Sequence, residues 1–403
     1  MIETSELGGR LALVDPKSLE TEQRSLYDFI DQKFVPWSRE ANFAIKIDGG
    51  RYVGPFNTFL YTPKVSKAFL EFMEAETQFS TLNARVREVV ILTCGAFWNA
   101  KYELYAHSAL ARKAGLSEQS IRALATGQPP EALSADERLA HDFTRQLITE
   151  HRVSQDLYSR AAATFGTAEL VNMTFLIGHY LLTSAVLNTF ETPAPDQQAD
   201  ITKKGYTIMG QTTLNQKTSD FGTFGRYTEI PVDQMTSEQR RGYELVVQER
   251  GEAPGPYKIF IQNPHLLQVL VPVGKYFQQS HSSLSDAERE IVVNLINAKW
   301  HAAYSNYEHE MIGERAGLPP EKVEALIAGL HTSFDDPRQQ VVYDVTCALI
   351  TPRIVPQGLY KRAVRLLGDT GLTDLTVLIG YFTSISMTLA AYDVPSDAVG
   401  LKR

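Results

Sequence analysis

The sequence predicts an all-α protein that contains one helical bundle twice. Apolar residues recur at helical spacing, helix-capping signals divide the chain, and the second half repeats the first. The alternation of apolar and polar residues that marks strands is hardly visible. With 403 residues, 43% of them hydrophobic and 21% charged, the composition is that of an ordinary globular protein of two or three domains.

An internal repeat predicts the domain organisation. At an offset of 202 residues, Arg87-Glu88 aligns with Arg289-Glu290, and the register holds as far as Pro193 and Pro395. Other pairs in the same register are Trp98 with Trp300, Tyr102 with Tyr304, His107 with His309, and Gly115 with Gly317. Upstream the offset changes, so the first copy carries extra residues around positions 35–53. We predict a first domain at residues 1–195 and a second at residues 230–403.

The residues at the expected helix ends justify the individual elements. Ser134-x-x-Glu137 and Ser285-x-x-Glu288 are capping boxes, and Ser117 and Pro319-Pro320 stand where short helices should start. Gly115 and Gly317 are placed as C-terminal caps. These signals predict five to eight helices in each copy, packed as a bundle.

Two runs without charged residues, at positions 170–190 and 375–392, are long enough to cross a bilayer. Asn172, His179 and Ser184 interrupt the first run, so we predict helices buried within the protein or between subunits. Residues 196–229 are polar and lack helical periodicity. They are interpreted as a linker or an arm that wraps the neighbouring repeat, with a lid over a site as the alternative.

Charge and cysteine content exclude several function classes. A net charge of −8 argues against nucleic acid and against an anionic membrane as partners. Two cysteines cannot form a disulfide framework, and the N-terminus lacks the pattern of a signal peptide. We therefore expect a cytoplasmic protein that acts on a small molecule.

The candidate catalytic residues are the polar groups that both copies keep. Of the nine histidines only His107 and His309 align, and Glu88 and Glu290 each precede their histidine by 19 residues. On one continuous helix that spacing separates the two side chains by about 100°. We therefore expect a helix break, at Gly95 or Asn99 in the first copy and at Asn297 in the second, which lets the glutamate face the histidine.

Two interpretations of this pair remain open: a general acid or base oriented by a carboxylate, or a buried polar contact that holds helices together. Tyr102 and Tyr304 are candidates for proton donors or substrate shelves, and equally for core residues. Glu103 lies one helical turn before His107 and, with Glu88, could complete a metal site. Ser305 stands at the equivalent position and is a poor ligand, so we expect no metal.

The cysteines and glycines predict no cofactor. Cys94 and Cys347 lack a neighbouring partner cysteine and lie in apolar helical contexts, where a thiol is ordinarily buried and inert. Phosphate-binding glycine loops, the nucleophile elbow and zinc-type cysteine spacing are all missing from the sequence.

The pattern from Arg87-Glu88-Val89-Val90 to Tyr102-Glu103-x-x-x-His107 and Ala114-Gly115-Leu116 resembles the carboxymuconolactone decarboxylase and alkylhydroperoxidase D-like superfamily, here as two fused copies. The resemblance implies an all-helical fold that oligomerises, in this case as a dimer or trimer of two-domain chains. The peroxidase branch carries a Cys-x-x-Cys pair where this chain has Ala100 and Glu103, so the resemblance implies the decarboxylase-type branch, with a role in aromatic catabolism, and not a peroxidase.

The hypothesis that follows is a cofactor-independent lyase for a small carboxylated lactone or related enolisable acid. His107 would donate the proton, Glu88 would orient it and Tyr102 would assist, with His309, Glu290 and Tyr304 in the same parts in the second copy. The alternatives are an isomerase, cyclase or hydrolase for another enolisable or polyketide-like substrate, and a non-catalytic small-molecule binding protein.

Overall fold

Sixteen α-helices make up most of the described chain, which in this computed structural model comprises residues 7–128, 130–195, 223–251, 253, 255–278, 282–351 and 353–395. The first half, up to residue 195, contains α1 (Thr21–Glu40), α2 (Pro55–Phe59), α3 (Pro63–Phe79), α4 (Ala84–Trp98), α5 (Lys101–Lys113), α6 (Glu118–Ala125), α7 (Ala135–Glu150) and α8 (Gln155–Thr189). The second half, from residue 223, contains α9 (Ser237–Arg250), α10 (Tyr257–Phe260), α11 (Pro264–Gln278), α12 (Asp286–Trp300), α13 (Ala303–Arg315), α14 (Pro320–Ile327), α15 (Pro337–Ile350) and α16 (Gln357–Ala391). One short hairpin pairs β1 (Thr223–Phe224) with β2 (Tyr227–Thr228). The all-α prediction is confirmed.

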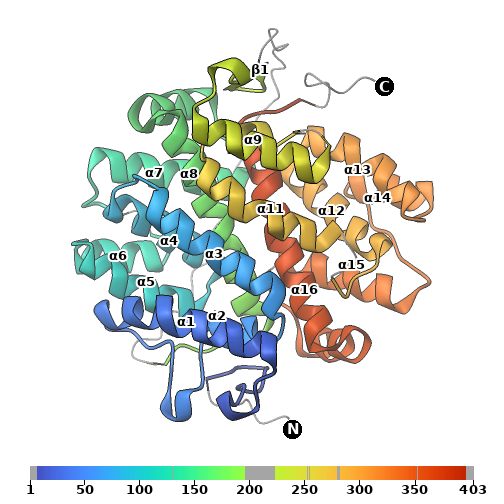
Figure 1. The fold of residues 1–403 in the computed structure, drawn as a ribbon, viewed down its shortest axis with the longest axis horizontal. Helices are drawn as coiled ribbons and strands as arrows, with labels where there is room; N and C mark the ends of the chain where they lie inside the picture. The colour runs from blue at the N-terminus through green and yellow to red at the C-terminus, as the bar shows by residue number, and fades with distance from the viewer. Residues whose placement is uncertain are drawn as a thin grey trace.

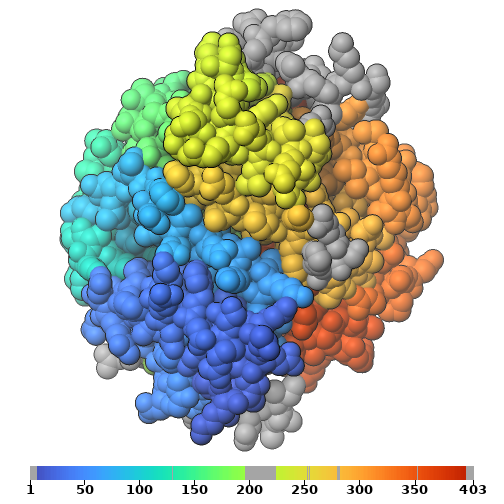
Figure 2. All heavy atoms as spheres, in the orientation of Figure 1, coloured from blue at the N-terminus to red at the C-terminus, as the bar shows by residue number. Residues whose placement is uncertain are grey.

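The two longest helices, α8 and α16, lie side by side in the centre. Most of the other helices of each half lie on either side, and α3 packs against α11 across the middle (Figure 1). Helices α8 and α16 contain the two charge-free runs of the sequence. By length and composition alone both helices could cross a membrane, but the apolar window is fully buried in α8 and 89% buried in α16. The prediction that these runs form helices buried within the protein is therefore confirmed. In the space-filling view the two halves form one continuous body (Figure 2).

Small residues allow α8 and α16 to approach closely. A Cβ atom added to Gly178 would lie 2.2 Å from Ser384 Oγ, and one added to Gly380 would lie 2.3 Å from Leu182 Cβ. At the offset of 202, Gly178 aligns with Gly380 and Leu182 aligns with Ser384, so the two contacts involve equivalent positions. The contact is therefore reciprocal, like an interface between two subunits related by a two-fold axis.

The helices repeat as the sequence does. Each of α4 to α8 begins 202 residues before its counterpart among α12 to α16. The predicted caps are present: Ser134 and Ser285 form capping boxes, and Ser117 caps α6. Gly115 and Gly317 both follow their helices with a φ of 92°. The division into domains at residues 195 and 230 stays a prediction.

Two arginines outside the helices join the halves in a reciprocal way. The Arg10 backbone N–H donates to the Phe190 carbonyl at 2.7 Å, and that of Arg226 donates to the Tyr392 carbonyl at 2.6 Å. The Arg10 guanidinium lies 4.7 Å over the Tyr360 ring of the second half, and that of Arg226 lies 4.9 Å over the Tyr158 ring of the first. Residues 223–228 thus pack against both halves, while residues 196–222 of the predicted linker or lid lie outside the described part.

Candidate active site

Glu88 and His107 meet across a turn between two helices. Helix α4 ends at Trp98, Asn99 adopts the left-handed conformation (φ 51°, ψ 41°), and α5 begins at Lys101. The reversal directs both side chains toward each other, and His107 Nδ1 lies 2.9 Å from Glu88 Oε2 with both side chains buried. Because a carboxylate accepts this hydrogen bond, Nδ1 is the donor and Nε2 is the ring nitrogen left for a ligand.

The second half repeats this bond with a different break. His309 Nδ1 lies 2.8 Å from Glu290 Oε2. The prediction that α12 ends at Asn297 is wrong: the helix continues to Trp300, and His301, which aligns with Asn99, takes the left-handed conformation. Asn297 is fully buried and accepts a hydrogen bond from Ser386 at 2.7 Å. Gly95, the other suggested break, lies inside α4.

A cavity of about 30 Å³ adjoins His107. Carbon atoms form almost all of its wall, and no lysine or arginine of the described chain lines it. Besides Tyr102, Glu103, His107 and His179, its walls include Trp37, Phe43, Phe56, Phe59, Met73 and Leu187. The volume is enough for roughly two water molecules, so a larger ligand requires side chains around the cavity to move.

Tyr102 lies in this cavity with its hydroxyl already bonded. It donates to the Ala44 carbonyl at 2.6 Å, and complete burial raises the pKa of Tyr102 well above its ordinary value, so the hydroxyl keeps its proton. Phe43 and Ala44 belong to the extra segment that the first copy carries. That segment therefore shapes the cavity, while in the second half Tyr304 donates to Glu308 at 3.1 Å.

Glu103 is buried beside the cavity and does not join the Glu88–His107 pair. Its Oε2 accepts from Ser184 at 2.7 Å, and its Oε1 has no hydrogen-bond partner among the described residues. Burial raises the pKa of Glu103 well above its ordinary value, because it disfavours the charged carboxylate. The metal set of Glu88, Glu103 and His107 is not assembled, and the described residues contain no cluster of three side chains arranged to bind a metal.

His179 is the candidate residue that the sequence analysis missed. It lies on α8 and lines the same cavity as His107, yet neither of its buried ring nitrogens has a hydrogen-bond partner in the described structure. Its ring stacks on Tyr180 at 4.6 Å. Burial, together with the nearby Arg87 and His107, lowers the pKa of His179 to about 3. Its signal in the sequence is a histidine inside a charge-free run, but it aligns with Tyr381 and not with a second histidine, so the repeat does not single it out.

The surroundings of the two aligned tryptophans and of the two cysteines indicate packing roles. Trp98 and Trp300 are buried. Cys94 is fully buried on α4, and burial raises the pKa of its thiol. Cys347 is half-buried, and its pKa is also raised by burial. Neither thiol has the electropositive setting that activates a cysteine.

Comparison with known proteins identifies part of this chain. The model of the carboxymuconolactone decarboxylase family matches residues 63–143, which run from the start of α3 into α7 and include Glu88, Tyr102, Glu103 and His107. No curated protein and no solved structure matches the chain. The helical architecture agrees with the fold that the sequence resemblance implied. Residues 63–143 are therefore similar to the carboxymuconolactone decarboxylase family.

Proposed function

We propose that the first half is a cofactor-independent lyase that decarboxylates a small enolisable acid, with His107 as the group that transfers the proton. The observation that carries this proposal is the His107 imidazole, held by Glu88 through Nδ1 and placed in the wall of a cavity. Orientation by a carboxylate fixes one tautomer and leaves one nitrogen for the reacting carbon.

The apolar wall supports loss of CO2. A carboxylate that enters a carbon-lined cavity loses its hydration. When its C–C bond breaks, CO2 leaves and the electron pair moves into a conjugated enolate, where the charge is spread over more atoms. The enolate carbon then takes the proton from Nε2 of the His107 imidazolium, and solvent reprotonates the ring. An apolar cavity raises the free energy of the delocalised enolate less than it raises that of the carboxylate, so the barrier to loss of CO2 falls.

An isomerase for a neutral enolisable molecule is the second candidate. The cavity lining has no lysine or arginine to attract a carboxylate, which favours an uncharged substrate. His107 would then remove and return a proton, and the product would have the mass of the substrate.

The test is mass spectrometry of γ-carboxylated lactones, β-keto acids and aromatic acids incubated with the protein. We expect loss of CO2 that falls at least about 100-fold in His107→Asn. His309→Asn and the double variant measure the share of the second pair, and His331→Asn, at an exposed position, is the control. A folded double variant with normal turnover would contradict the proposal, and a product of unchanged mass would favour the isomerase.

A further inference from the structure

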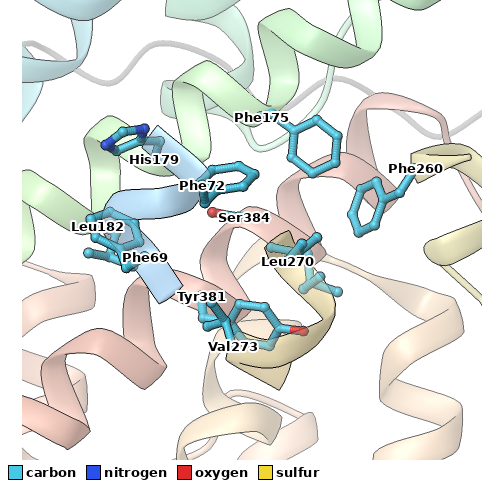
Figure 3. Close-up of a pocket in the computed structure, with 11 residues that line it drawn as sticks. Phe69, Phe72, Phe175, His179, Leu182, Phe260, Leu270, Val273, Tyr381 and Ser384 are labelled. Carbon is cyan, nitrogen blue, oxygen red and sulfur yellow. The ribbon is translucent and has the colours of Figure 1, made fainter. Parts of the chain in front are cut away.

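A second cavity, of about 20 Å³, lies between the two halves (Figure 3). Phe69 and Phe72 of α3 and Phe175 of α8 enclose it from the first half. Leu270 and Val273 of α11 and Tyr381 of α16 enclose it from the second. Its wall is almost entirely carbon, so the cavity suits a hydrocarbon group and offers no charged partner.

His179 separates this cavity from the one beside His107. Among the described residues, it is the one that lines both cavities. Its ring is packed by aromatic neighbours, with Phe69 at 4.9 Å and Tyr180 at 4.6 Å between ring centroids. No described hydrogen bond anchors either ring nitrogen. The ring can therefore turn without breaking a hydrogen bond.

The unbonded nitrogens also indicate a ligand. A buried polar atom without a partner costs free energy, and folded proteins rarely keep one without a reason. A neutral imidazole has one N–H donor and one acceptor nitrogen. Both match a carbonyl or hydroxyl group on a molecule that passes from one cavity to the other.

We propose that the cavity between the halves binds the apolar tail of the substrate, an alkyl or aryl substituent, with His179 as the residue where the two cavities join. The reacting group then lies beside His107, and the second half sets the length of tail that the first half accepts. The identification of the ligand as a substrate rests on the proposed function, whereas the two-part binding site does not.

Binding of 4-alkylphenols tests the site without turnover. Calorimetry is performed with phenol and its 4-ethyl, 4-propyl and 4-butyl derivatives. We expect the affinity to rise about fourfold for each added CH2 until the tail fills the cavity. Val273→Phe, which fills the cavity from α11, should abolish this gain and leave phenol binding unchanged. Val269→Phe, the same change at a position on α11 that does not line the cavity, should keep the wild-type series.

Three results would overturn the proposal. One is an affinity that does not change with tail length. Another is an equal loss of phenol and 4-butylphenol binding in Val273→Phe. The third is the absence of a change in the His179 ring-nitrogen resonances when 4-butylphenol binds. If Val273→Phe does not fold, Ile385→Ala widens the cavity and should shift the preferred tail to a longer one. A length series that holds while His107→Asn retains turnover would refute the proposed function alone.

Discussion

His179 is a buried polar residue that lowers the stability of the fold and lies in the wall of a cavity. Its ring is fully buried among aromatic side chains and makes no described hydrogen bond. Glu103, a few side chains away in the same cavity wall, is likewise buried with one unbonded oxygen. Burial disfavours the charged form of both groups, so it raises the pKa of Glu103 and lowers that of His179. These two buried polar groups share the cavity wall with the oriented imidazole of His107.

The pH dependence of stability should reveal the buried imidazole. The pKa of His179 is about 3 in the folded protein and about 6.5 when unfolded, so the unfolded state gains a proton first as the pH falls. Through His179 the folded state loses stability below pH 6.5, by about 2 kcal/mol at pH 5, and His151, whose pKa burial also lowers to about 3, adds its own loss in both the wild type and a His179 variant. We expect His179→Phe to lack the loss that is due to His179. Urea unfolding at pH 7.5 and pH 5 measures it, and equal losses in both proteins would refute the assignment.

At the scale of elements, a loop and a helix together position Tyr102. Gly54, at the start of α2, has a φ of 66°, and an added Cβ would lie 2.3 Å from the Tyr102 ring. Gly255 approaches Tyr304 in the same way, at 2.5 Å. Only glycine fits here, because both the backbone conformation and the space exclude a side chain.

Gly54→Ala should therefore destabilise the protein by more than backbone strain alone. The matched control is Gly166→Ala, where φ is 75° and no atom lies within 4 Å of the added Cβ. We expect a cost of about 1–3 kcal/mol for the control and a larger one for Gly54→Ala, with weaker 4-alkylphenol binding because Tyr102 is displaced. Urea unfolding and calorimetry measure both. Equal effects of the two changes would show that contact with Tyr102 is unimportant.

The elements that were predictable from sequence are those with local chemical signals. Nearby residues in the sequence are enough to recognise the caps at Ser134 and Ser285 and the 19-residue spacing of glutamate and histidine. The second helix break was not predictable, because histidine at position 301 is a poorer signal for the left-handed conformation than asparagine at position 99. The partner of Tyr102 also left no signal, since it is a backbone carbonyl.

On the scale of the whole molecule, the halves are joined through the close contact of α8 with α16. Gly380→Ala places a methyl group 2.6 Å from the Leu182 backbone, so the helices must separate. We expect a loss of about 1–3 kcal/mol in the free energy of unfolding, measured in urea. Gly358→Ala, also in α16 but with nothing within 4 Å of the added Cβ, should instead stabilise by about 0.5–1 kcal/mol. If both substitutions change the free energy of unfolding in the same direction, the contact between α8 and α16 is not tight.

The joining of the halves was the least predictable feature. Arg10 and Tyr360 are 350 residues apart in the chain, and although Tyr360 aligns with Tyr158 in the repeat, the alignment does not indicate that an arginine of the other half lies over each ring. The cavity between the halves depends in the same way on side chains of α3, α8, α11 and α16 that meet only after folding.

The reciprocal contacts of Arg10 and Arg226 have a consequence for how the two sites can change. In a symmetric dimer of identical chains, any mutation appears on both sides of the axis. Here both partners of the contact are parts of one polypeptide, so a change on one side is not copied to the other. Glu103 in one half and Ser305 in the other, and an added segment on one side alone, are differences that a pair of identical chains could not have. Linkage would allow one half to specialise in the proposed chemistry while its neighbour forms part of the proposed binding wall.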